Sequence, residues 1–291
     1  MASATAIRIS RISATTSAIR PRSEAGMEMV RRFHTKSGMA YAEQGAGEPL
    51  LLIHGVGMRL EAWAPQMAAL GKGHRVIAVD MPGHGESRAL PENAGLDGFV
   101  AWLGLFLDDL DLDRVNVAGH SMGALIAGGV AASFGNRVSR VALLNGVYRR
   151  DAAASAAVIG RAREIRAGLV DVDGPLQRWF GADSRDSDVY RLTHRWLASV
   201  DRAGYATAYA AFAAGDGTYA DCWPKVTCPA LFLTGSDDPN STPAMARAMA
   251  DAAPNGYAVL IDGHRHMVNL TAPDEVNAIL SEWLAKPEAA R

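Results

Sequence analysis

The sequence that decides the fold is Val115-Asn116-Val117-Ala118-Gly119-His120-Ser121-Met122-Gly123-Ala124. It begins as a short apolar strand and continues, through the pattern G-x-S-x-G, into the small and apolar residues of a helix. A serine in such a turn sits on a strained backbone, with its hydroxyl held away from the strand. Gly119 and Gly123 have a steric role, because a Cβ atom at either position would collide where strand and helix nearly touch. The pattern alone is weak, so matching partners must be found elsewhere in the chain.

Length and composition are those of an ordinary globular chain. The 291 residues suit one large domain or two small ones, and 49% of them are apolar. A net charge of −2 gives no field that attracts nucleic acid or an anionic membrane. The two cysteines, Cys222 and Cys228, are too few for a disulfide scaffold, and their spacing fits no zinc motif. We therefore expect a cytoplasmic protein with reduced thiols that binds neither nucleic acid nor membrane.

The N-terminal segment has a composition of its own. Residues 1–23 contain four arginines, five serines and no acidic residue, which resembles an organellar transit peptide. No apolar core or cleavage signal follows. We expect residues 1–26 to form a disordered tail, and organellar import through this segment is the alternative.

The order of the predicted elements indicates a mostly parallel sheet with helices on both faces. A strand pair is predicted within 27–44, and apolar runs of strand length follow at 50–53, 75–80, 114–118, 138–145, 230–234 and 257–261. Continuous apolar strands suit a sheet that is buried on both faces. Helical segments between most of them give right-handed crossovers. We therefore predict an α/β fold with an eight-stranded sheet.

Residues 146–221 interrupt this alternation, because they contain helical stretches but no clear buried strand. We interpret 146–221 as a helical cap over the carboxyl edge of the sheet, where open α/β sheets bind ligands. The core is then 27–145 with 222–291. Arg149 or Arg150 is a candidate partner for a substrate carboxylate. The alternative for either arginine is a solvated ion pair on the surface.

Polar side chains that could activate Ser121 stand after two of the predicted strands. A serine hydroxyl needs a base, and the base needs an orienting acid. Asp237 and Asp238 follow strand 230–234, and His264 and His266 follow strand 257–261. The two histidines could instead bind a metal ion, but no third ligand stands nearby.

Taken together, the motifs resemble those of the α/β-hydrolase superfamily from about residue 27 to the last residue. The matching stretches are His54-Gly55-Val56-Gly57, Asp80-Met81-Pro82-Gly83-His84-Gly85-Glu86-Ser87, Gly119-His120-Ser121-Met122-Gly123, Gly235-Ser236-Asp237-Asp238 and His266 with Pro273. They are specific for the fold and for a serine triad, but poorly specific for the substrate. Thr271 departs from the pattern, since relatives often carry glutamate at this place.

The resemblance implies a choice within each pair. In the family the acid stands last in G-x-x-D and the histidine stands seven residues before the helix-opening proline, which selects Asp238 and His266. Some relatives place the acid after the strand that here ends near Asn145. An amide cannot stabilise an imidazolium as a carboxylate does, which supports Asp238. The expected triad is therefore Ser121, His266 and Asp238.

Two backbone N–H groups are expected to form an oxyanion hole. One belongs to Met122, directly after the serine, and by resemblance the other belongs to Val56. The alternatives to substrate binding are loop-shaping hydrogen bonds for the histidines and core packing for the aromatic residues. The candidate substrate-binding residues are His54, His120, Trp179, Trp196 and Tyr209.

The sequence therefore predicts a serine hydrolase, without cofactor or metal, that acts on a small carboxylic ester or lactone through an acyl-enzyme. The turn Gly-His-Ser-Met-Gly resembles those of esterases, enol-lactonases and cofactor-free haloperoxidases. The runner-up is hydrolysis of an amide, or of a C–C bond in a β-diketone-like substrate, on the same triad. A ligand-binding receptor on the same scaffold is the alternative of another class. The only expected partner is a small acyl substrate.

Overall fold

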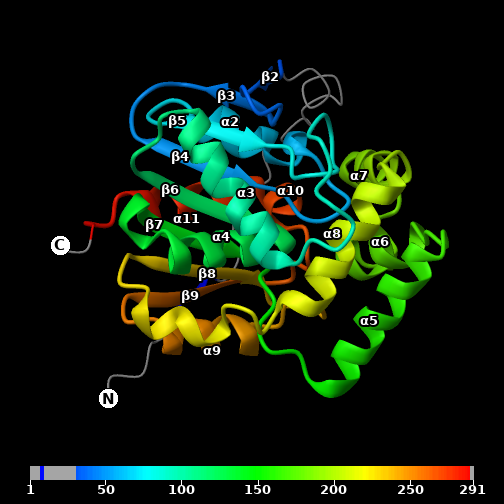
Figure 1. Cartoon of the computed structure of the whole chain (residues 1–291). Coiled ribbons are helices and arrows are strands. Elements are labelled where there is room, and N and C mark those ends of the chain that lie inside the picture. The colour runs from blue at the N-terminus through cyan, green and yellow to red at the C-terminus, as the bar shows by residue number, and fades with distance from the viewer. Residues whose placement is uncertain (1–6, 10–30, 289–291) are drawn as a thin grey trace.

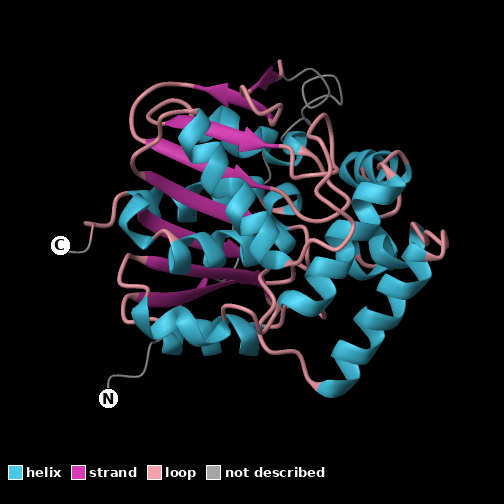
Figure 2. Cartoon of the chain, in the orientation of Figure 1, coloured by secondary structure: helices cyan, strands magenta, loops and turns pink. Residues whose placement is uncertain are grey.

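One mixed β-sheet forms the centre of the computed structural model, which describes residues 7–9 and 31–288 (Figures 1 and 2). The strand order is β1-β9-β8-β7-β6-β4-β5-β3-β2. Neighbouring strands are parallel except in the pairs β2–β3 and β3–β5. The strands are β1 (Ile7–Ile9), β2 (Phe33–His34), β3 (Ala40–Gln44), β4 (Pro49–Ile53), β5 (Arg75–Val79), β6 (Val115–His120), β7 (Val138–Leu144), β8 (Ala230–Gly235) and β9 (Gly256–Ile261).

The predicted eight-stranded, mostly parallel sheet is confirmed by β2–β9. The segment predicted as a tail, 1–26, contributes a ninth strand that was not expected, because β1 pairs in parallel with β9. Its Ile-Arg-Ile sequence has two β-branched residues, which favour a strand, and the pairing covers what would be an open edge. The rest of 1–26 lies outside the described residues.

Alternate residues of the central strands pack on opposite faces of the sheet. In β4, Leu51 and Ile53 join one apolar cluster, whereas Leu50 and Leu52 join the other. Helices α3, α4 and α9 cover the first face, and α2, α10 and α11 cover the second. The helices of the core are η1 (Leu60–Trp63), α2 (Ala64–Leu70), α3 (Leu96–Asp109), α4 (Met122–Ser133), η2 (Gly135–Arg137), α9 (Pro243–Ala252), α10 (Val268–Thr271) and α11 (Pro273–Leu284).

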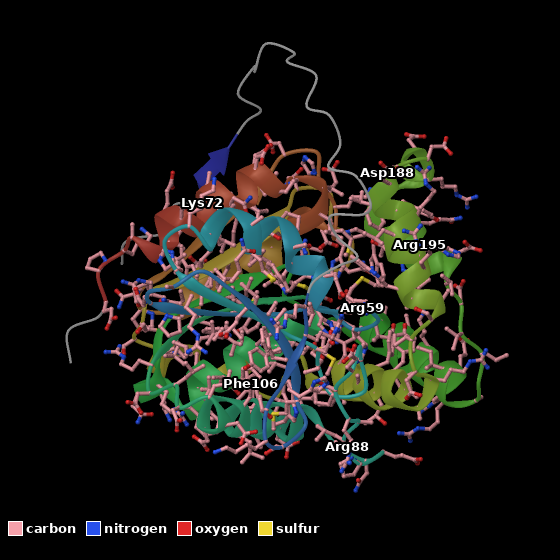
Figure 3. The ribbon with its side chains drawn as sticks, turned by 90° about the horizontal axis from the view of Figure 1, so that it is seen from above. Arg59, Lys72, Arg88, Phe106, Asp188 and Arg195 are labelled. Carbon is pink, nitrogen blue, oxygen red and sulfur yellow. The ribbon has the colours of Figure 1, made fainter. Side chains whose placement is uncertain are left out.

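The chain between β7 and β8 contains helices and connecting loops, and we call it the cap. Figure 1 shows the cap at the end of the sheet toward which the parallel strands point. In Figure 3, Asp188 and Arg195 lie on its outer side, far from Lys72, whereas Phe106 lies within the body of the molecule. The cap helices are α5 (Ala152–Arg166), α6 (Asp173–Phe180), η3 (Ala182–Ser184), α7 (Asp188–Ala198), α8 (Arg202–Gly215) and η4 (Ala220–Lys225).

The turn between β6 and α4 is so tight that its two glycines cannot be replaced without collision. Ser121 has φ 56° and ψ −113°, a backbone conformation that L-residues rarely adopt. A Cβ atom on Gly119 would lie 2.0 Å from the carbonyl oxygen of Gly123. One on Gly123 would lie 2.2 Å from the carbonyl oxygen of Ile53. Both obstacles are backbone atoms, so the elbow can form only with glycine at these positions.

We expect Gly123→Ala to lower the free energy of unfolding by at least about 3 kcal/mol. The added methyl group would collide with backbone atoms, which cannot move aside as a flexible side chain can. Gly160→Ala is the matched control: it lies in α5, and a Cβ there meets no atom within 4 Å. That variant should be as stable as the wild type or slightly more stable. Urea unfolding measures both, and an unimpaired Gly123→Ala protein would contradict the collision.

Candidate active site

Three side chains from three separate loops meet at the carboxyl edge of the sheet. Ser121 stands at the elbow after β6, Asp238 follows β8, and His266 follows β9. His266 Nε2 lies 3.0 Å from Ser121 Oγ, and His266 Nδ1 lies 2.8 Å from Asp238 Oδ2. All three residues are buried. This hydrogen-bonded chain gives the serine a base, and the base an acid that orients it.

The structure distinguishes between the two candidate acids and between the two candidate histidines. The Asp237 side chain is exposed and accepts a hydrogen bond from the Ser236 hydroxyl, not from an imidazole. His264 Nδ1 lies 3.0 Å from the hydroxyl oxygen of Thr271, the residue that departs from the family pattern. Only Asp238 and His266 lie in line with the serine.

Asp238 is held as a carboxylate by the groups around it. Burial by itself would raise its pKa. The charge and hydrogen bond of His266 outweigh that effect, together with donors from Asn145 Nδ2 and the backbone N–H of Asn240, each at 2.8 Å. The pKa of Asp238 therefore lies below its usual value.

The role of Asn145 was missed by the sequence analysis, which considered it only as the site of an absent acid. It stands just after β7 with φ 49°, and its amide also contacts Thr234 Oγ1 at 3.1 Å. The backbone carbonyl oxygen of Asn145 accepts a hydrogen bond from the Ser241 hydroxyl at 2.6 Å. Asn145 thus fixes the position of the Asp238 carboxylate. A polar residue at the end of the strand beside the acid was the signal for this role.

The histidines of the loops after β4 and β5 hold the loop that carries Val56. His54 Nε2 accepts from the Met81 N–H at 2.9 Å, and His84 Nε2 accepts from the Gly57 N–H at 2.9 Å. Burial is the largest influence on both, and it lowers the pKa of His54 to about 3 and that of His84 to about 4. Both rings are therefore neutral near pH 7.

His120 does the same for the loop that carries the base. Its Nε2 lies 2.7 Å from the carbonyl oxygen of His266, and burial lowers its pKa to about 3. His54 and His120 were expected to bind substrate, but both rings are fully buried and bond backbone groups. They shape the site without lining it, which was the stated alternative.

A cavity of about 300 Å³ lies between the cap and the sheet, and Ser121 and His266 form part of its wall. Of the expected pocket residues, Trp179 and Tyr209 line it. Trp196 does not, because its ring packs in the apolar core, where packing of the cap overrides the helical pattern. The backbone carbonyl of Trp179 accepts a hydrogen bond from the backbone N–H of His266 at 3.1 Å. The rings of the same two residues are stacked, with centroids 6.0 Å apart.

The two backbone N–H groups expected to bind an oxyanion belong to different elements, the loop after β4 and the first turn of α4. Val56 lines the cavity. Met122 is the first residue of α4, where N–H groups have no partner within the helix. The helix dipole adds partial positive charge at this end. The N–H groups of Val56 and Met122 therefore remain the candidates for binding an oxyanion.

Comparison with known proteins agrees with this geometry. A sequence model of the alpha/beta hydrolase family matches residues 50–279. The chain belongs to the alpha/beta hydrolase family. It is 52% identical over 244 residues to the (E)-2-((N-methylformamido)methylene)succinate hydrolase of Acinetobacter baylyi, covering 84% of this chain and 93% of that protein. It is 29% identical over 233 residues to 3-oxoadipate enol-lactonase 1 of the same organism, covering 76% and 83%.

Solved structures of hydrolases share this fold. The enol-lactonase of Burkholderia xenovorans superposes with a TM-score of 0.78 at 27% identity, covering 88% of this chain and all of that one. An esterase from Thermogutta terrifontis gives a TM-score of 0.79 at 25% identity, covering 90% of this chain and all of that one. The protein is therefore an enzyme of the alpha/beta hydrolase family.

Within residues 7–9 and 31–288, no group of three or more histidine, cysteine or acidic side chains is arranged to hold a metal ion. His264 and His266 in particular point to different partners. In the same part of the hydrolase, no helix has the length and apolar character needed to cross a bilayer.

We expect Asn145→Asp to slow the reaction of this hydrolase at Ser121 by at least tenfold near pH 6. Asn145 Nδ2 lies 2.8 Å from Asp238 Oδ2, a distance at which two carboxylates cannot both be ionised. The two acids would therefore share a proton, and Asp238 would lose part of the charge with which it orients and stabilises the imidazole. Asn145→Ala adds no charge and should give a smaller loss. The rate of fluorophosphonate labelling between pH 5 and 8 measures this. Identical profiles for the wild type and Asn145→Asp would contradict the assigned role of Asn145.

The three buried histidines should make the hydrolase less stable as the pH falls. Their pKa values in the folded state are about 3 to 4, below the ordinary 6.5, so the unfolded chain binds more protons between these values. Stability is therefore complete above pH 6.5 and declines toward pH 4, by up to about 1.4 kcal/mol per pH unit for each ring. Urea unfolding at pH 7.5, 6 and 5 measures the slope. The half-buried His74, changed to Asn, should leave it unaltered, and a flat profile would refute the argument.

Proposed function

We propose that Ser121, His266 and Asp238 are the catalytic triad of this hydrolase. The observation that carries the proposal is the unbroken chain of hydrogen bonds from the Asp238 carboxylate through the imidazole to the serine hydroxyl, with distances of 2.8 and 3.0 Å. Distances of this kind permit proton transfer in the transition state. The strained backbone at Ser121 supports the same role, since such strain collects at functional sites.

Each residue then has a defined task. Ser121 Oγ attacks the substrate carbonyl carbon while His266 Nε2 takes its proton, and Asp238 stabilises the imidazolium that forms. The N–H groups of Val56 and Met122 bind the oxyanion of the tetrahedral intermediate. His266 gives the proton to the leaving group, an acyl-enzyme remains, and a water molecule activated by His266 releases the acid.

The substrate that we propose is a small amide related to the one named for the Acinetobacter relative. Identity of 52% across most of both chains supports this choice over the ester or lactone expected from the sequence. The name describes an N-methylformamido group attached through a methylene carbon to succinate. Attack of Ser121 on the formyl carbon would break the C–N bond, transfer the proton to nitrogen and leave a formyl ester on the serine. Water would then release formate and restore the hydroxyl.

Ester or lactone hydrolysis is the second candidate. It is favoured by the likeness to enol-lactonases in sequence and in structure. The same triad performs it, with an alcohol in place of the amine as the leaving group. A receptor without turnover is the third, and it differs from both enzymes in releasing no product.

The triad predicts a pattern of variants. Ser121→Ala should abolish labelling by a fluorophosphonate, and His266→Ala and Asp238→Asn should each lower turnover by about 10³- to 10⁴-fold. His264→Ala and Asp237→Asn are matched controls that should keep most of the activity. Turnover is measured on N-formyl enamides of succinate, on simple esters and on lactones.

The outcomes separate the candidates. Formate release from the enamide at a higher kcat/KM than from formyl esters supports the amide hydrolase. Preference for esters or lactones would replace it with the second candidate. Labelling of Ser121 without turnover of any compound would favour the receptor, and a dead His264→Ala enzyme beside an active His266→Ala enzyme would overturn the triad.

A further inference from the structure

Three arginines stand in the wall of the cavity that contains Ser121. They are Arg150 before α5, Arg161 within α5 and Arg178 within α6. Among the described residues of this wall the one acidic side chain is Asp151, whose Oδ1 already accepts the N–H of Ala154 at 2.8 Å. The wall of the cavity is thus strongly cationic, although the whole chain has a net charge of −2.

Arg150 is held rigidly with one nitrogen left over. Its side chain is 3% exposed, and its Nη1 donates to Asp216 Oδ1 at 3.0 Å and to the Phe212 carbonyl at 3.3 Å. The guanidinium carbon lies 4.4 Å from the centre of the Phe212 ring. Its Nη2 is buried and has no hydrogen-bond partner among the described residues. A buried donor without an acceptor is destabilising, and a ligand oxygen would remove that cost.

Arg149 and Arg150 were both candidates for this role from the sequence. The structure separates them, because Arg149 is exposed and forms its ion pair with Asp221. Asp216 also accepts the backbone N–H of Arg150 at 2.6 Å, so it fixes both ends of that residue. Asp216 thereby orients the guanidinium while leaving its second nitrogen free for a ligand.

Arg161 and Arg178 form a second positive position. Neither makes an ion pair or a side-chain hydrogen bond with any described residue. Burial is the largest cause of the lowered pKa of Arg178. Repulsion by the positive charge of Arg161 lowers that pKa further. Asp171 and the Tyr205 and Tyr209 hydroxyls oppose this effect only in part. Two neighbouring guanidinium groups in a cavity wall are the usual arrangement for holding an anion.

The two positions are well separated along the cap. Arg161 lies nine residues beyond Ala152, the first residue of α5, so about 14 Å of helix separates the backbone positions. This is longer than succinate, so the long arginine side chains, which line the cavity, must make up the difference. Between them the residues of α5 that face the cavity are Ala154, Ala157 and Val158, at the spacing of one helix face. Their small side chains leave room for a ligand to extend from one cationic position toward the other.

We propose that the cavity recognises a dicarboxylate, with Arg150 binding one carboxylate and the Arg161–Arg178 pair binding the other. This inference rests on the proposed function, because it assigns the substrate class of the same site. Arg150 and Arg178 are then specificity residues: they hold the two acid groups and so present the acyl carbon to Ser121. The succinate portion of the compound named for the Acinetobacter relative carries two such groups.

The test uses competition with fluorophosphonate labelling of the wild-type protein. Succinate should protect Ser121 at a concentration at least tenfold lower than butanoate or succinamide, and the protection should weaken as salt is added. In Arg178→Gln and in Arg150→Gln, the ratio of protection by succinate to protection by succinamide should fall more than tenfold below the wild-type ratio. Arg149→Gln and Arg163→Gln, both exposed, are matched controls and should protect like the wild type.

Calorimetry of succinate binding to Ser121→Ala separates this inference from the triad. If Ser121 is never labelled but the alanine variant binds succinate through Arg150 and Arg178, the triad fails and the dicarboxylate site stands. Equal protection by succinate, butanoate and succinamide would overturn the site, as would equal losses in Arg149→Gln and Arg178→Gln. Because Arg178 is only half-buried, its variant keeps the test valid should Arg150→Gln fail to fold.

Discussion

At the carboxyl end of β6, the backbone of α4 approaches β6 and β4 more closely than any side chain would permit. The two glycines that flank the serine make this approach possible, and the serine between them takes a positive φ as a result. The same geometry points the hydroxyl away from the sheet and places the first N–H groups of α4 beside it. The positions of the Ser121 hydroxyl and of the first N–H groups of α4 are therefore consequences of one backbone contact, and the other residues of the candidate site lie around it.

A buried polar shell holds the rest of the site in register with the elbow. Its histidines bond backbone groups of neighbouring loops, and burial keeps them neutral near pH 7. Asn145 does the same for the acid, so that the carboxylate is stabilised although it is almost fully buried. Buried hydrogen-bonded networks of this kind resist displacement and are rigid, because moving one member leaves another buried group without its partner. Rigidity of the shell is what keeps the Ser121–His266 distance short before substrate arrives.

The sheet was predictable from the sequence because continuous apolar runs have few other structures available to them. The candidate triad was predictable because acid and histidine must stand at the ends of strands, and spacing within family motifs chose Asp238 and His266 over their neighbours. The packing of Trp196 and the pairing of β1 were not predictable, because they depend on contacts between segments far apart in the chain. The position of Asn145 at a strand end was a signal, but its contact with Asp238 depends on the same long-range packing. The cap shows the difference most clearly. Its helices could be predicted from the local sequence pattern, but the helix face that lines the cavity is determined by packing against distant segments.

Ser121 and His266, whose side chains are hydrogen-bonded in the site, are separated by 145 positions in the chain. During synthesis the elbow can form early, since β4, β6 and α4 precede the cap, but β8 and β9 emerge only after the cap is complete. An incomplete nascent chain therefore contains the alcohol without its base. In the proposed triad the base is thus the last member to be synthesised, and we expect a chain that ends before β9 not to react at Ser121.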